Sequence, residues 1–195
     1  MKYILRLTIA PLIFFIFFIV IAMGIYALNA GDVLRIILGG LSFIMLLLCL
    51  GGIMVKEGED AIKTLLANDI QRREIIRTGK DVELNVSKEY RPWKGFIVGL
   101  ILCIPLVIFI ILFNPNGVQE GVLNFGKLAE VVYSPFYVLV GDFSKTTSLH
   151  FYIGAIIVLV CFPLMLGIPY ILGAHIRKNQ TKIAKELHKN IHGDV

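Results

Sequence analysis

Four long apolar runs constrain the fold of this chain more than any other feature of its sequence. None of the four contains Asp, Glu, Lys, Arg or His. A helix needs about 20 apolar residues to cross the hydrocarbon core of a bilayer, with a range of about 17–25. The sequence therefore predicts an all-α integral membrane protein with a single membrane domain over residues 1–195. Its four transmembrane helices are expected at residues 7–28, 36–55, 96–113 and 151–172.

The composition excludes the water-soluble class. The chain is 57% hydrophobic and 17% charged, whereas globular chains are about 45–50% apolar and about 25% charged. Four helices with almost no polar face would leave a soluble fold without a surface to meet water. The first run is longer than the apolar region of about 7–15 residues in a signal peptide, so we expect it to remain as a helix.

Lys and Arg gather in the segments that this threading places on one side of the membrane. Sixteen of the nineteen lie in residues 1–6, 56–94 and 173–195. Basic residues collect in cytoplasmic segments, so both termini and the loop 56–94 are expected to be cytoplasmic at the plasma membrane. Residues 114–150 then form an outer loop. We interpret the net charge of +5 as a topology signal that also attracts anionic lipid headgroups, with no nucleic-acid partner.

The loop 56–94 and the tail 173–195 carry further patterns. Residues 59–77 have an apolar stripe at helical spacing, and predict a helix that either continues from the second run or lies on the membrane surface. Thr78-Gly79 is a helix stop signal. Residues 82–86 alternate between apolar and polar side chains, which indicates a short strand or an extended loop that could pair with another protein. The basic tail is also predicted to be helical.

The residues just before the third run are typical of a membrane interface. Tyr90, Arg91, Trp93 and Lys94 combine aromatic rings, which favour the headgroup level, with basic side chains that extend toward it. We interpret them as an interfacial anchor, and a specific headgroup-binding site is the alternative. Gly95 and Gly99 follow as a G-x-x-x-G motif, which favours packing within the bundle over a homodimer face.

The outer loop contains a second apolar segment, residues 128–140, which is too short to span a membrane. It is interrupted by Glu130 and by Ser134-Pro135. Segments of this length are interfacial or re-entrant. The sequence leaves two placements open: the segment lies flat at the interface, or it enters the membrane and lines a cavity.

The chain lacks the short motifs of known enzyme classes, and we expect no catalytic residue, no cofactor and no metal site. Absence of ionisable residues from all four runs argues against an ion-coupled pump. If the chain had an outer-face polar site, its members would be Glu130, Asp142 and His150.

Three short motifs resemble sequences of small four-span membrane proteins of Gram-positive bacteria, a group without a characterised activity. They are Tyr90-Arg91-Pro92-Trp93-Lys94-Gly95-Phe96, Tyr133-Ser134-Pro135-Phe136-Tyr137 and Ile168-Pro169-Tyr170-Ile171-Leu172-Gly173. The resemblance covers the second half of the chain. It implies a four-span topology in a bacterial plasma membrane.

These patterns favour a non-enzymatic accessory or interaction subunit. The loop 56–94 and the basic tail would contact a protein partner or anionic lipid, and the chain could also form a homo-oligomer. The alternative is a small oligomeric transporter or channel in which residues 128–140 line part of the path.

Overall fold

The computed structural model describes residues 2–27, 32–79, 84–112, 131–136 and 148–192. Each of its four long helices contains a stretch long and apolar enough to cross a membrane, which confirms that part of the prediction. The long helices are α1 (Lys2–Ala27), α2 (Asp32–Thr78), α3 (Trp93–Leu112) and α6 (Ser148–His192), and two short 3-10 helices are η1 (Val86–Lys88) and η2 (Ser134–Phe136).

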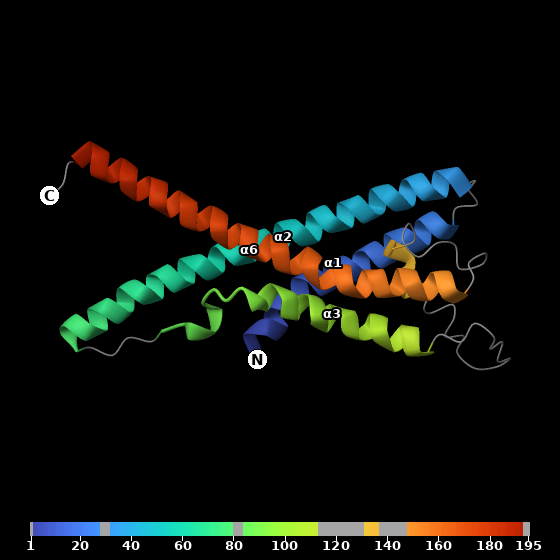
Figure 1. Cartoon of the computed structure of the whole chain (residues 1–195), viewed down its shortest axis with the longest axis horizontal. Coiled ribbons are helices and arrows are strands. Elements are labelled where there is room, and N and C mark those ends of the chain that lie inside the picture. Colours follow the sequence, from blue (N-terminus) through green and yellow to red (C-terminus); the bar gives the residue numbers. More distant parts are fainter. Residues whose placement is uncertain (1, 28–31, 80–83, 113–130, 137–147, 193–195) are drawn as a thin grey trace.

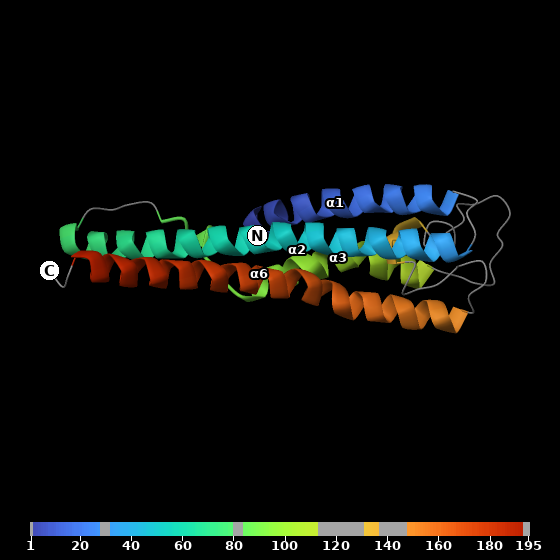
Figure 2. The same cartoon turned by 90° about the horizontal axis from the view of Figure 1, so that it is seen from above.

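The four long helices form a bundle from which two of them project (Figures 1 and 2). With 47 and 45 residues, α2 and α6 are each about 70 Å long, more than twice the hydrocarbon thickness of about 30 Å. We call their projecting parts the α2 arm (residues 56–78) and the α6 arm (residues 173–192). The predicted helices at 59–77 and in the tail are thus continuous with the apolar helices before them.

The outer surface of the bundle is apolar, as a lipid environment requires. Ile13 is 58% exposed, Leu48 is 67% exposed and Ile111 is 75% exposed. Inside, large apolar side chains from α2, α3 and α6 fill the space between the helices. Those with at most 1% exposure include Leu46, Leu50, Met54, Leu102, Leu106, Phe162 and Leu166.

Glycines let α3 pack closely against α6. A Cβ atom added at Gly99 would lie 2.5 Å from the Cα of Pro163, and one added at Gly95 would lie 2.7 Å from the Cβ of Tyr170. Both distances are too short for a real Cβ atom. The G-x-x-x-G motif therefore packs within the bundle, as predicted, because small residues allow helix backbones to approach in lipid.

The α2 and α6 backbones approach each other very closely at the point where the two helices cross. A Cβ atom added at Gly58 would overlap the carbonyl oxygen of Tyr170, and one added at Gly173 would overlap the carbonyl oxygen of Val55. The two backbones therefore touch at this point, and the two arms diverge beyond it (Figure 1).

The α2 arm ends where the sequence predicts. Gly79 has a φ of 66°, which glycine adopts without steric strain, and its N–H donates to the carbonyl of Ile75 at 2.8 Å. The strand predicted for residues 82–86 is wrong over its described part. Val86 begins the 3-10 helix η1, and Leu84 and Asn85 have no regular structure.

The described part of the segment 128–140 is packed into the bundle and does not lie flat against it. Tyr133 is 0% exposed and Phe136 is 1% exposed. The Tyr133 hydroxyl donates to the carbonyl of Leu106 at 3.0 Å. The Phe136 ring lies 5.6–6.0 Å from the rings of Phe15, Phe43 and Phe162, so η2 contacts three of the long helices.

Candidate functional site at the charged end of the bundle

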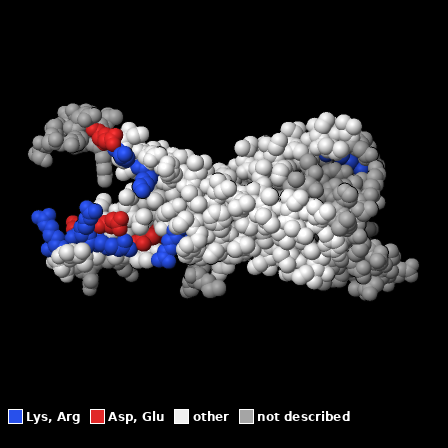
Figure 3. All heavy atoms as spheres, in the orientation of Figure 1, with Lys and Arg blue, Asp and Glu red and all other residues white. Residues whose placement is uncertain are grey.

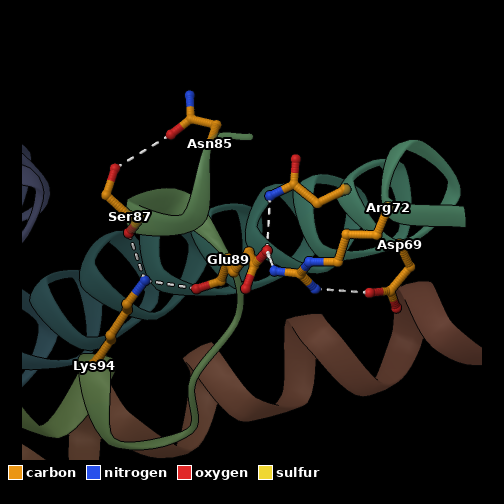
Figure 4. A network of polar contacts seen from close by, with 7 residues as sticks. Asp69, Arg72, Asn85, Ser87, Glu89 and Lys94 are labelled. Atoms are coloured by element: carbon orange, nitrogen blue, oxygen red, sulfur yellow. Dashed lines mark hydrogen bonds and ion pairs between the residues drawn. The ribbon is translucent and has the colours of Figure 1, made fainter. Parts of the chain in front are cut away.

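Charged side chains gather where the arms leave the bundle and along the arms themselves (Figure 3). We call this region, where α1 and α3 also begin, the charged end. It contains the residues for which the sequence predicts an interfacial role, and it contains the longest polar network in the described structure (Figure 4). This network is the centre of the candidate site.

Glu89 is the centre of the network. It is 7% exposed, and its carboxylate accepts hydrogen bonds from the amide of Asn68 at 2.8 Å and from the guanidinium of Arg72. Arg72 also pairs with Asp69 at 3.0 Å. Because a buried carboxylate is stable only when it is paired and hydrogen-bonded, this network ties the segment before α3 to the α2 arm.

Lys94 lies on the other side of the same segment. Its ammonium donates to the backbone carbonyls of Ser87 at 2.7 Å and of Glu89 at 2.6 Å. It also lies 4.9 Å from the centre of the Tyr3 ring, which adds a cation–π attraction. Lys94 is only 4% exposed, so its side chain contacts groups within the protein itself.

Tyr90 anchors the segment to both projecting helices. Its N–H donates to the carbonyl of Ala61 in α2 at 3.2 Å. Its ring stacks on Tyr170 of α6, with ring centres 5.5 Å apart and planes 17° apart. Burial raises the pKa of the Tyr90 hydroxyl above its ordinary value.

Arg91 and Trp93 are the two exposed members of the predicted interfacial set. Trp93 is 41% exposed, and the Arg91 guanidinium lies 6.0 Å from the centre of its ring. The four residues predicted from one sequence motif thus divide into two groups. Tyr90 and Lys94 hold the segment in place, and Arg91 and Trp93 face outward at the start of α3.

Of the predicted outer-face polar residues, only His150 has a described backbone. Glu130 and Asp142 are outside the described residues, and His150 lies in the first turn of α6, with a side chain that is also outside them. Among the residues that the structure does describe, no three His, Cys, Asp or Glu side chains are grouped so that they could hold a metal ion.

Sequence reasoning missed Glu89 and Asn68. Glu89 looks like an ordinary loop acid in the sequence. Asn68, which is 3% exposed, offers a weak signal, because it is an uncharged polar residue close to the apolar stripe of residues 59–77. A buried amide needs hydrogen-bond partners, and those partners come from a segment about 20 residues away in the sequence.

The arms present both apolar and basic side chains to solvent. Ile76 is 85% exposed, Ile70 is 67% exposed and Ile183 is 58% exposed. Basic side chains stand next to them. The exposed ones are Lys56, Lys63, Arg73, Arg77, Lys178 and Lys182.

Comparison of the chain with protein-family models, with curated proteins and with solved structures finds no match.

Proposed function

We propose that this protein is a non-enzymatic membrane subunit that binds a protein partner through its two arms on the cytoplasmic side of a bacterial plasma membrane. The observation that carries the proposal is the projection of α2 and α6 beyond the bundle. Both arms are helical, and both expose isoleucine side chains next to basic ones. A surface of this kind is suited to a partner helix or groove.

Helix stability supports a binding role for the arms. Most helical stability in proteins comes from packing of an apolar face. The outer parts of the two arms diverge and do not pack on each other (Figure 1). A partner that covers Ile70, Ile76 and Ile183 would supply that packing and remove their apolar surface from water.

The cytoplasmic orientation is supported by the location of the basic residues. The arms, the start of α1 and the segment before α3 carry sixteen of the nineteen Lys and Arg residues, and such residues collect on the cytoplasmic side. Arg91 and Trp93, which are exposed at the start of α3, would contact lipid headgroups there. We propose that this contact is an anchor at the membrane interface.

The packing of the bundle does not favour the alternative of a transporter or channel. Tyr133 and Phe136, from the segment that would line a path, are packed between helices. Fully buried Leu50, Leu102 and Leu166 fill the interior on the way to the charged end. A polar path through one copy is therefore not supported, and a path would have to form between copies.

Co-purification from native membranes tests the proposed function. The full chain, a chain that ends after Lys178 and a control chain without residues 193–195 would be tagged, cross-linked in intact membranes and purified in mild detergent. We expect one polypeptide to accompany the full chain and the control in fixed ratio and to be lost from the shortened chain. A chain that always purifies alone, or a partner that does not need the arm, would contradict the proposal.

A further inference from the structure

The two arms enclose an open notch. They diverge from the crossing of Gly58 with Gly173 (Figure 1), and the space-filling view shows the surface hollowed between them (Figure 3). In the same view, Lys and Arg atoms line both edges that border the notch. We call this notch the fork.

Helical geometry identifies the residues of the α2 arm that border the fork. Asn68 faces the segment before α3, because its amide binds Glu89. At about 100° per residue, Ile70, Arg73 and Arg77 lie about 140–180° around the helix from Asn68. In Figure 1 the segment before α3 lies on one side of the α2 arm and the α6 arm lies on the other. These three residues therefore lie on the side of the fork.

The basic groups of the fork are available to a ligand. Arg72 is paired with Asp69 and Glu89, and Lys63 is paired with Asp60. By contrast, the structure shows Arg73, Arg77 and Lys178 in no ion pair with another described residue, and all three are exposed.

The α6 arm adds to the positive charge of the fork. Among its described side chains, Arg177, Lys178 and Lys182 are basic and Glu186 is acidic, and the Lys182 ammonium lies 4.0 Å from the Glu186 carboxylate. Arg73, Arg77 and Lys178 are therefore exposed basic groups of the arms that pair with no described acid.

Anionic lipid is too far away to supply a counter-charge on the α2 arm. Arg73 lies 18 residues after Val55, where the apolar run ends, which is about 27 Å along the helix axis. The headgroup layer is about 6 Å thick on each side of the bilayer, and the Debye length is about 8 Å at physiological ionic strength. The potential of the membrane surface is thus largely screened at Arg73.

The arm is also a poor match for nucleic acid. A phosphate backbone binds through its neutralisation by Lys and Arg and offers no apolar surface to an exposed isoleucine. Ile70, which is 67% exposed, calls for an apolar contact between the basic groups. A protein helix that carries both carboxylates and apolar residues meets both requirements.

We propose that the fork binds an acidic amphipathic helix of a soluble protein, with carboxylates paired to Arg73 and Arg77 and to basic side chains of the α6 arm, and with an apolar side chain placed on Ile70. This inference rests on the proposed function and specifies the chemistry of the partner. The helix would bridge the two arms and reach beyond the headgroup layer, where a soluble protein has access.

The test uses the full chain in nanodiscs of zwitterionic phosphatidylcholine. The probe is a fluorescent 21-residue helical peptide of Leu and Glu with one apolar stripe, and binding is measured by fluorescence anisotropy. A peptide with Lys in place of Glu and a peptide with the same composition but scattered leucines are the controls. We expect the acidic amphipathic peptide to bind best, with an affinity that falls as salt is raised, because salt screens exposed charges.

Two charge-reversal variants that change the net charge equally distinguish binding in the fork from a non-specific effect of the protein's charge. Arg77→Glu should weaken binding of the acidic peptide about fivefold or more. Lys88→Glu, an exposed position on the other side of the α2 arm, should leave it within about twofold. Equal effects of the two variants, equal binding of the Lys peptide or binding that does not respond to salt would each overturn the proposal.

A lipid occupant would have a different signature. Hydrogen–deuterium exchange of the unmodified chain would be compared between zwitterionic nanodiscs and nanodiscs with anionic phosphatidylglycerol. We expect amides near Arg73 to exchange alike in both, and protection by the anionic lipid alone would overturn the proposal. A native partner that needs the arms but is unaffected by Arg77→Glu would overturn this inference and leave the proposed function intact.

Discussion

At the scale of single residues, the buried carboxylate of Glu89 connects parts of the chain that are distant in sequence. It accepts hydrogen bonds from Asn68 and Arg72 of the α2 arm. Its own backbone carbonyl accepts a hydrogen bond from the ammonium of Lys94. One residue thus joins the α2 arm, the short helix η1 and the start of α3, and the order of the charged end depends on it.

Replacing Glu89 with alanine should therefore destabilise the fold. The change removes the acceptor of two hydrogen bonds and leaves the buried amide of Asn68 unsatisfied, which costs about 1–3 kcal/mol. The measurement is the midpoint of thermal unfolding in detergent, followed by circular dichroism. Glu74→Ala is the matched control, because Glu74 is exposed on the same arm and should change the midpoint little.

A second residue-scale prediction concerns Tyr133. Tyr133→Phe keeps the ring but removes the hydroxyl that donates to Leu106, so it should cost about 1 kcal/mol. Tyr133→Ala also empties a fully buried site and should cost about 3–5 kcal/mol. Unfolding midpoints measured for the pair check both values. If neither change lowered the midpoint, η2 would not be packed into the bundle.

The sequence shows which kinds of contact a side chain can make, but it shows less well which way that side chain points. The motif at residues 90–94 predicts side chains at a membrane interface. It does not reveal that Lys94 turns inward, because its acceptors are backbone carbonyls of Ser87 and Glu89, and the position of a carbonyl depends on the local fold of η1. The Arg91 guanidinium lies near the Trp93 ring and is exposed.

At the scale of elements, the contact between α2 and α6 depends on glycine. Gly58→Ala should separate the two helices, because the new methyl group would overlap the carbonyl oxygen of Tyr170. Overpacking of this kind costs about 1–3 kcal/mol. Gly52→Ala is the matched control in the same helix. Nothing lies within 4 Å of the atom it adds, so it should be neutral or raise stability by about 0.5–1 kcal/mol.

Thermal unfolding of both variants checks this prediction, and the spacing between the arms provides a second measurement. Distances between spin labels placed at Arg77 and Lys182 should change with Gly58→Ala and stay the same with Gly52→Ala. Equal unfolding midpoints and equal distances for the two variants would show that the helices do not touch at Gly58.

Apolar periodicity and length were sufficient to predict the four helices and the end of the α2 arm. Within residues 82–86, the described residues form no strand, because a short strand needs a partner strand to form hydrogen bonds. Leu84 and Asn85 have no regular structure, which agrees with the alternative of an extended loop. The crossing at Gly58 could not be predicted. Glycines are frequent along α2, and only the path of α6 determines which of them touches another backbone.

At the scale of the whole molecule, the packed interior predicts the absence of a path through a single copy. Proteoliposomes that contain the purified chain should release small solutes and ions no faster than protein-free liposomes of the same lipid. The physical reason is the set of fully buried leucines between η2 and the charged end. Fluorescent-dye release and ion flux measure this, and selective flux of one solute would support the oligomeric transporter.

Of the overall architecture, only the membrane-spanning part of the helices and their orientation could be predicted from the sequence. The apolar runs indicate which residues lie in lipid, and the basic residues indicate one side. The fork depends on the angle at which α2 and α6 cross, and that angle is determined by the contact of Gly58 with Tyr170 and of Gly173 with Val55. Such a contact is a property of two distant segments together.

The crossing also gives the molecule a mechanical property. The apolar parts of α2 and α6 lie on one side of the contact and the arms lie on the other, as in a pair of scissors (Figure 1). From Gly58 to Thr78 the α2 arm is about 30 Å long, so a rotation of about 10° at the crossing moves its tip by about 5 Å. A small change in helix tilt, such as a change in bilayer thickness produces, is thereby transmitted to the ends of the arms.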